Sequence, residues 1–170
     1  MKSLVIYFSR ADENYFGGKL INIDKGNTEI AAEFIKEIMG ADLFKVERKN
    51  DYSKNYMACI EEAKLELKNN ERPELKKYLD DISKYDVIFI GSPIYWGTMP
   101  KPLFTELEML DFNNKIIMPF TTHEGSGLAN VVNDIRKIAE GAIIKNGLAI
   151  LGSDVKNSKR LIENWINDNL

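Results

Sequence analysis

Three clusters of polar, glycine and aromatic residues follow short apolar runs of the sequence. The first combines Ser9-Arg10 with residues 26–29, the second covers residues 91–100, and the third covers residues 121–127. The apolar run before each cluster has the composition of a buried strand. Because ligands of open α/β sheets bind beyond the carboxyl ends of the strands, we expect the three clusters to meet in one pocket.

The first cluster has the residue types of a phosphate site. Ser9 and Arg10 end an apolar run, and Gly26-Asn27-Thr28-Glu29 opens a segment with helical spacing. Hydroxyl and amide side chains would lie there beside free backbone N–H groups, where the helix dipole favours an anion. An alternative is that Asn27 or Thr28 only caps the helix, and the two roles can coexist.

The second cluster places two large aromatic residues in a loop. Its sequence is Gly-Ser-Pro-Ile-Tyr-Trp-Gly-Thr-Met-Pro, and the aromatic pair is Tyr95-Trp96. Glycine and proline on both sides exclude a helix at this point. An exposed aromatic pair at a strand end is favourable if one ring covers a planar ligand. The alternative is that Trp96 packs on a neighbouring helix.

The third cluster, Thr121 to Gly127, is polar and glycine-rich, and it leads into a helix. Such a loop can lay backbone donors and acceptors along the edge of a heterocycle. His123 is the only histidine of the chain. No histidine cluster for a metal and no Cys-His pairing pattern are therefore available, and we predict neither a metal site nor a catalytic nucleophile.

Motifs of several other nucleotide-binding and hydrolytic proteins are missing. The first apolar run is followed neither by GxGxxG nor by GxxxxGK[ST], which excludes a dinucleotide-binding Rossmann turn and a P-loop. A receiver domain would need acidic residues where Ser9-Arg10 and Gly91-Ser92 stand. The hydrolase elbow G-x-S-x-G is also absent, because Gly125-Ser126-Gly127 lacks its five-residue frame.

The elements that must position these clusters alternate along the whole chain in the order βαβαβαβαβα. Continuous apolar strands separated by helical segments are typical of a parallel sheet with helices on both faces, a doubly wound α/β fold. The predicted strands are residues 4–8, 42–46, 87–90, 116–120 and 148–151, and the helical spacing covers 30–38, 57–67, 103–110, 131–138 and 161–166.

Composition agrees with one ordinary globular domain spanning residues 1–170, since 44% of the residues are apolar and 29% are charged. A net charge of −3 argues against a nucleic-acid partner. Cys59 is the only cysteine, which excludes an internal disulfide, and its place in a helical apolar pattern predicts burial. The apolar run near the N-terminus is too short for a membrane span, so we expect a cytoplasmic protein without a membrane partner.

Taken together, the three clusters resemble the flavodoxin family, in particular flavodoxin-like proteins with an enlarged first loop. The resemblance spans nearly the whole chain, and its motifs follow successive strands in the expected order. It implies a three-layer sandwich around a five-stranded parallel sheet of order 2-1-3-4-5. It also implies FMN, held non-covalently at the switch point between the first and third strands.

The resemblance also assigns tasks to individual residues. The first cluster would hold the 5′-phosphate. Arg10 and Lys25, which bracket residues 11–26, would offset its charge, in departure from the family's largely neutral site. The second would form one flavin loop, with Tyr95 or Trp96 stacked on the ring, and the third would line the pyrimidine edge and the opposite face. The cofactor-binding residues implied are Ser9, Arg10, Asn27, Thr28, Pro93, Ile94, Tyr95, Trp96, Gly97, Thr121, Thr122, His123 and Gly125.

Residues 11–26 depart from the family pattern, because flavodoxins usually close the phosphate loop within about half a dozen residues. The alternating apolar residues of this excursion predict a small hairpin that turns at Gly17-Gly18. One interpretation is a packed surface loop. The other is a hairpin that roofs part of the flavin or receives a redox partner, since both of its ends are anchored at the phosphate site.

The function implied first is an FMN protein that carries one or two electrons between larger redox proteins. Acidic neighbours of the ring, with Glu124 as a candidate, would disfavour the anionic reduced flavin. An alternative is an FMN-dependent reductase of quinones, nitro compounds or similar small molecules, which would use NAD(P)H and a proton from His123. A third reading is a cofactor-free binding module that keeps the fold for protein contacts.

Overall fold

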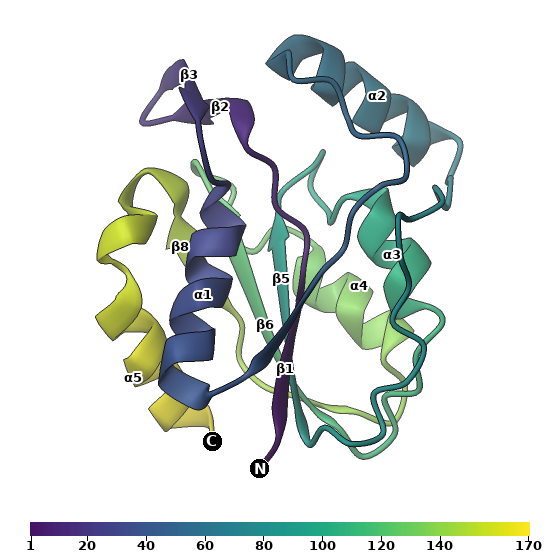
Figure 1. Ribbon diagram of the computed structural model, residues 1–170, viewed down its shortest axis with the longest axis vertical. Coiled ribbons are helices and arrows are strands. Elements are labelled where there is room, and N and C mark those ends of the chain that lie inside the picture. The colour runs from purple at the N-terminus through teal and green to yellow at the C-terminus, as the bar shows by residue number, and fades with distance from the viewer.

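The computed structural model describes all 170 residues. Its centre is a six-stranded parallel sheet with helices on both faces (Figure 1). The strand order β4-β1-β5-β6-β7, with β8 also paired to β6, confirms the predicted order 2-1-3-4-5 of a flavodoxin-like sandwich. The strands of this sheet are β1 (Ser3–Tyr7), β4 (Asp42–Lys45), β5 (Val87–Pro93), β6 (Ile116–His123), β7 (Ile143–Ile144) and β8 (Leu148–Leu151).

The edge position next to β6 differs from the prediction, because two short strands share it. β7 pairs with the beginning of β6, at Ile116 and Ile117, and β8 pairs with its end, from Phe120 to His123. Between them the carbonyl oxygen of Asn146 accepts a hydrogen bond of 2.8 Å from the indole N–H of Trp165. The Trp165 side chain, from the last helix, thus supplies a hydrogen-bond donor for a backbone carbonyl where the edge strand is interrupted.

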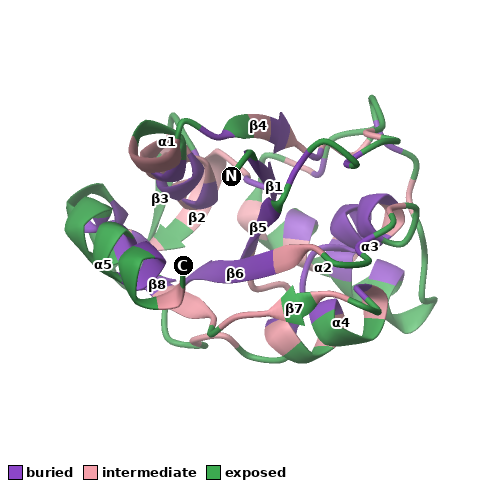
Figure 2. Ribbon diagram, turned by 90° about the horizontal axis from the view of Figure 1, so that it is seen from below, coloured by how far each residue is buried: buried purple, intermediate pink, exposed green.

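Two apolar cores lie on the two faces of the sheet. Val5 and Phe89 point into the core under α1 (Asn27–Met39) and α5 (Lys159–Asn169), while Leu4 and Ile88 point into the core under α3 (Lys101–Leu107) and α4 (Val131–Ile138). Neighbouring residues therefore serve opposite faces, as the pleat of a strand requires. Figure 2 shows the buried strands between helices whose outer faces are exposed. None of the helices is both long and apolar enough to cross a membrane.

The helix α2 (Tyr56–Lys68) does not cover the sheet as a crossover helix would. It lies beyond the carboxyl ends of the strands, at the top of the molecule in Figure 1. The segment that follows it packs Leu75, Ile82 and Tyr85 against the core, each at most 4% exposed. Because irregular chain covers this part of the sheet, α2 is free to serve as a wall above the strand ends.

Residues 11–26 form the predicted hairpin. β2 (Asp12–Phe16) and β3 (Lys19–Ile23) pair antiparallel in a two-stranded sheet of their own. Gly17 and Gly18 make the turn, with φ of 64° and 82°. Positive φ at both central residues matches the twist of a two-residue hairpin turn, and glycine adopts it without a steric penalty. In Figure 1 the hairpin stands next to the top of α1.

A buried carboxyl group in α3 affects the stability of this fold. Glu106 is fully buried, and its Oε1 accepts a hydrogen bond of 2.9 Å from the backbone N–H of Leu79. Its Oε2 has no hydrogen-bond partner. Burial, with a smaller contribution from the charge of Asp80, raises the pKa of Glu106 to about 7. The carboxyl group is therefore protonated in the folded protein at mildly acidic pH.

We expect the Glu106→Gln variant to lose less stability than the wild type as the pH rises. The native carboxyl group binds its proton more tightly than the unfolded one, whose pKa is near 4.5. Its contribution is therefore complete below pH 4.5 and is lost as the pH rises to about 7, at up to roughly 1.4 kcal/mol per pH unit. Urea unfolding at about pH 5 and about pH 8 measures this difference.

Glu163→Gln, at an exposed position of α5, is the matched control for this prediction. Its free energy of unfolding should follow that of the wild type at both pH values. If Glu106→Gln also followed the wild type, the buried carboxyl group would not be the source of the pH dependence.

Candidate cofactor site

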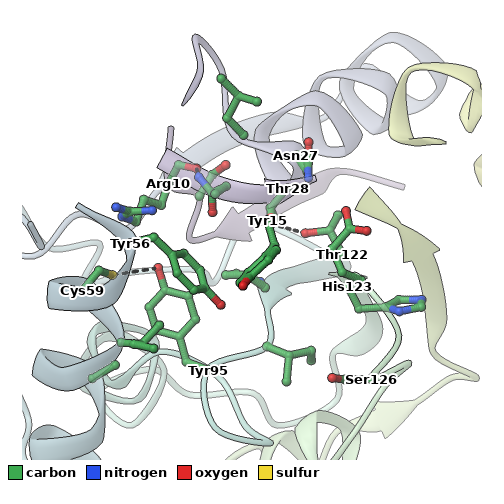
Figure 3. Close-up of a pocket in the computed structure, with 18 of the residues that line it drawn as sticks. Arg10, Tyr15, Asn27, Thr28, Tyr56, Cys59, Tyr95, Thr122, His123 and Ser126 are labelled. Carbon is green, nitrogen blue, oxygen red and sulfur yellow. Dashed lines mark hydrogen bonds between the residues drawn. The ribbon is translucent and has the colours of Figure 1, made fainter. Parts of the chain in front are cut away.

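A cavity of about 490 Å³ opens at the carboxyl ends of β1, β5 and β6 (Figure 3). Its size is in the range of pockets for small ligands and cofactors. The residues predicted for the site come together there with three exceptions. Gly97, Thr121 and Gly125 do not line the cavity, whereas the other ten predicted residues do: Ser9, Arg10, Asn27, Thr28, Pro93, Ile94, Tyr95, Trp96, Thr122 and His123.

One end of the cavity is the N-terminus of α1, and Ser9 caps this helix from the preceding strand end. Gly26 occupies the N-cap position and has no side chain to offer. The Oγ of Ser9 instead accepts a hydrogen bond of 3.0 Å from the backbone N–H of Glu29. The alternative in which Asn27 or Thr28 caps the helix is therefore wrong. Because the Ser9 hydroxyl is the acceptor in this bond, its own proton remains free to bind an anion.

Further donors collect at the same end. The hydroxyl groups of Thr28 and Thr122 lie 2.7 Å apart, and both residues are at most 5% exposed. One hydroxyl donates to the other, so the pair keeps one proton for an additional acceptor. The backbone N–H groups of Asn27 and Thr28 have no acceptor within the protein. Hydroxyl and amide donors at the positive end of a helix dipole fit a phosphate group.

The two basic residues near this end are engaged elsewhere. The guanidinium group of Arg10 donates to the carbonyl oxygens of Ser53 and Lys54, at 2.7 and 2.9 Å, although its side chain lines the cavity. Lys25 lies outside the cavity and forms an ion pair of 2.8 Å with Glu33. The geometry therefore supports a phosphate site built from neutral donors, and charge compensation by Lys25 has no structural support.

The loop after β5 is a tight turn that presents its aromatic residues in different ways. Tyr95 and Thr98 exchange backbone hydrogen bonds of 2.8 and 3.3 Å, and Trp96 and Gly97 between them have φ of 54° and 81°. Left-handed backbone is unfavourable for a tryptophan. The indole N–H of Trp96 donates to the carbonyl of Ile60 in α2, at 2.8 Å, which holds the residue in place. Gly97 thus sets the conformation of the turn and does not line the cavity.

Tyr95 is the aromatic residue whose position is fixed by the core. Its ring makes edge-to-face contacts with Phe8 and Tyr52, at centroid distances of 5.7 and 5.8 Å, and it lines the cavity. Burial raises the pKa of its hydroxyl well above the usual value, so the side chain stays neutral. Trp96 is 47% exposed and packs on α2, as the alternative interpretation of this residue stated. A rigid, neutral ring is suited to stacking.

The loop after β6 is held by its own hydrogen bonds. The hydroxyl of Thr121 donates to the carbonyl of Gly127 at 2.8 Å, and the backbone N–H of Gly125 donates to Nδ1 of His123 at 2.9 Å. Thr121 and Gly125 therefore shape the loop and do not face the cavity. Since Nδ1 of His123 is an acceptor, the proton of the neutral imidazole is on Nε2. Glu124 also lines the cavity.

Two elements contribute lining residues beyond the predicted ones. The hairpin, whose ends are anchored at the phosphate end, faces the cavity as the roof interpretation predicts. The sequence indicates the contribution of α2 only indirectly. Apolar residues that follow this helix can cover the sheet, which leaves the helix free to lie elsewhere. The additional lining residues are Asn14, Tyr15, Gly18 and Ile23 of the hairpin, Tyr56, Cys59, Ile60 and Ala63 of α2, and Glu124 and Ser126.

The cavity lies where the chain reverses its direction of winding across the sheet, between β1 and β5. It has hydroxyl and amide donors at one end and a fixed aromatic ring on one wall. A doubly wound sheet with these features at its switch point defines a cofactor-binding protein of the flavodoxin-like class.

Comparison with known proteins agrees with this class. The family model described as flavodoxin matches residues 15–169, and the chain belongs to the flavodoxin family. No curated protein matches the sequence.

Solved structures of similar proteins cover nearly the whole chain. A candidate flavoprotein from Bacteroides eggerthii is 26% identical, with 98% of this chain and 96% of that chain covered and a TM-score of 0.77. A second one, from Bacteroides uniformis, is 24% identical, with coverage of 98% and 97% and a TM-score of 0.75. A flavoprotein from Lactobacillus acidophilus in complex with FMN is 22% identical, with coverage of 92% and 97% and a TM-score of 0.63.

Proposed function

We propose that this protein binds FMN in the cavity and carries electrons between redox partner proteins. Membership of the flavodoxin family identifies FMN as its cofactor. The observation that carries the proposal is the pairing of a donor-rich α1 N-terminus with an aromatic wall in one cavity. The similar Lactobacillus acidophilus flavoprotein, which is in complex with FMN, supports the same cofactor.

In this proposal, different groups of cavity residues contact different parts of the cofactor. Ser9, Thr28 and Thr122, with the free N–H groups at the start of α1, hold the phosphate. Tyr95 packs against the ring, and the end of β6 at His123 borders another part of it. The flavin supplies the electron chemistry, and the protein supplies orientation and electrostatics. The negative charge of Glu124 at the cavity disfavours additional negative charge on the reduced ring.

The rim of the cavity suits transient contact with another protein. Trp96 and Tyr15 line the cavity and still expose 47% and 44% of their surfaces. Aromatic side chains at the mouth of a cofactor pocket are typical of surfaces where partners dock. An electron carrier needs its flavin within reach of such a partner. This arrangement supports electron transfer between proteins.

Anaerobic reductive titration of the FMN-loaded protein tests the carrier proposal. We expect the flavin to take up electrons in two separate one-electron steps, which its visible spectrum resolves. Uptake of two electrons in a single step at every point of the titration would argue against one-electron transfer.

A second candidate function is reduction of quinones or similar small molecules with NAD(P)H. The enclosure of the cavity by the hairpin and α2 favours it, since a reductase needs a pocket for its substrate. His123 would then donate a proton from Nε2. Rapid oxidation of NAD(P)H by the FMN-loaded protein in the presence of a quinone would favour this function, and absence of turnover would favour the carrier.

A further inference from the structure

One wall of the cavity comes from elements that do not belong to the three strand-end loops. The hairpin contributes Tyr15 and α2 contributes Tyr56, and both side chains line the cavity (Figure 3). Their rings are perpendicular, with an interplanar angle of 88° and centroids 4.9 Å apart. An edge-to-face contact of this kind joins the hairpin to α2 at the cavity itself.

Polar contacts support the same junction. Arg10, directly before the hairpin, binds the carbonyl oxygens of Ser53 and Lys54, directly before α2, at 2.7 and 2.9 Å. The carboxylate of Glu13 in β2 accepts a hydrogen bond of 2.9 Å from the backbone N–H of Tyr56. That N–H is one of the groups left free at the start of α2, where a negative charge is favourable. The junction is therefore built from several independent contacts.

The opposite end of the hairpin reaches the third strand-end loop. At its turn, the backbone N–H of Gly17 donates to the carboxylate of Glu124 at 3.4 Å. The hairpin thus extends from α2 on one side of the cavity to the loop after β6 on the other. Gly18 and Ile23 of the hairpin line the cavity along this course.

The hairpin is well placed to move. Its two strands pair only with each other and not with the central sheet. A two-stranded hairpin is marginally stable by itself, so its position depends on the contacts at its ends. Tyr15, Leu20 and Ile21 of the hairpin are between 37% and 44% exposed, which means that little apolar packing holds it down. Such segments open locally at low cost in free energy.

We propose that Tyr15 and Tyr56 form a second ring-binding wall, which closes over the isoalloxazine of FMN and slows its release. The inference rests on the proposed function, because it assumes that FMN occupies the cavity. Tyr95 is held by the core, and its hydroxyl contacts the thiol of Cys59 in α2 at 3.8 Å. The hairpin that carries Tyr15 pairs only with itself, so it is the part of this wall that opens.

The rate of FMN release tests this wall. We expect Tyr15→Ala and Tyr56→Ala each to release FMN about tenfold faster than the wild type, the change that corresponds to the loss of one aromatic contact. Tyr15→Phe and Tyr56→Phe keep the rings and should release FMN at nearly the wild-type rate. Leu20→Ala and Met57→Ala are matched controls on the same elements, because both residues are exposed and lie outside the cavity.

Alkylation of Cys59 supplies a second measurement, and the chain has no other cysteine. Cys59 lies in α2, is 2% exposed and lines the cavity, and burial raises the pKa of its thiol. Its alkylation therefore reports how accessible the interior of the cavity is to a reagent. We expect saturating FMN to slow the reaction at least tenfold in the wild type and much less in Tyr15→Ala.

The outcomes separate the inference from the proposed function. If the wild type binds FMN but the alanine variants release it at the wild-type rate, or FMN does not protect Cys59, the second wall is wrong and the cofactor assignment stands. If the wild type does not bind FMN at all, both are wrong. Faster release in the two alanine variants, together with protection of Cys59, supports the wall.

Discussion

Replacing Gly26 with alanine is expected to weaken FMN binding about a hundredfold, which corresponds to roughly 2.7 kcal/mol. Riboflavin, which has the same ring system without the phosphate, should bind with an affinity changed by less than about threefold. The difference between the two ligands identifies the affected part of the site as the phosphate end.

The physical reason is a close approach of two chain segments. A Cβ atom at Gly26 would lie 2.1 Å from Oγ of Ser9, and 2.8 and 2.9 Å from the backbone O and N of Arg10. The φ of Gly26 is −63°, which every residue adopts, so the effect is steric and does not come from backbone strain. Ser9 must therefore move, and the protein loses both the cap of α1 and one hydroxyl donor for the phosphate. Loss of the cap should also cost about 1 kcal/mol of stability.

Fluorescence titration of the apoprotein with each flavin measures the effect. Gly147→Ala is the matched control, because the nearest atoms to its added Cβ are side-chain ends of Leu128 and Val132, which can yield, and the residue lies outside the cavity. An equal loss of affinity for FMN and riboflavin in Gly26→Ala would place the phosphate elsewhere.

Replacing Tyr95 with alanine is expected to damage both the fold and the ring site. The side chain packs against Phe8 and Tyr52 and also lines the cavity. Because the side chain is half-buried, its removal should cost about 2 kcal/mol of stability, less than the loss of a fully buried aromatic ring. It also removes the fixed wall for the flavin, so FMN affinity should fall at least about tenfold.

The comparison with Trp96→Ala decides which aromatic residue serves the ring. Trp96 is 47% exposed and is held on α2 by its hydrogen bond to Ile60 and by Lys64, whose Nζ lies 5.4 Å from the ring centroid, so its loss should weaken FMN binding less than about threefold. Tyr95→Phe keeps the ring and should bind FMN almost as tightly as the wild type. Urea unfolding and flavin fluorescence titration measure the two effects separately. A larger loss of affinity in Trp96→Ala than in Tyr95→Ala would reverse the assignment.

The sequence was sufficient to predict the strand order and the meeting of three loops. Continuous apolar runs identify strands that are buried on both faces, and in a parallel sheet their carboxyl ends share one edge. The pair Gly17-Gly18 between alternating residues was also sufficient for the hairpin, since positive φ at both positions favours glycine. These features depend on local chemistry and on general rules of topology.

The position of α2 could not be predicted in the same way. Helical spacing shows that one face of a helix is apolar, but it does not show which surface that face contacts. Here Leu75, Ile82 and Tyr85 cover the sheet, and α2 turns Cys59 toward the cavity. Two segments compete to cover the same surface of the sheet. The folded structure shows which of them does so, and the sequence alone does not.

Two predicted site residues, Thr121 and Arg10, bind partners within the protein for a similar reason. Thr121 begins the third polar cluster of the sequence, but it lies inside β6, and its hydroxyl donates to the carbonyl of Gly127 in the loop that follows. Arg10 follows the first strand as a phosphate-binding residue would, but three backbone carbonyls, those of Glu13, Ser53 and Lys54, accept its hydrogen bonds. Residue type indicates what a side chain is able to bind, whereas the partner depends on which unpaired backbone groups the fold brings close.

Titration of the purified apoprotein with FMN, followed by flavin fluorescence and by the visible spectrum, tests the central claim most directly. The structure predicts saturation at about one FMN per chain, because one cavity combines the phosphate donors with the aromatic wall. It also predicts quenching of flavin fluorescence, because Tyr95 lies against the ring. FMN that keeps its full fluorescence and separates from the protein during gel filtration would contradict the assignment of this cavity as a flavin site.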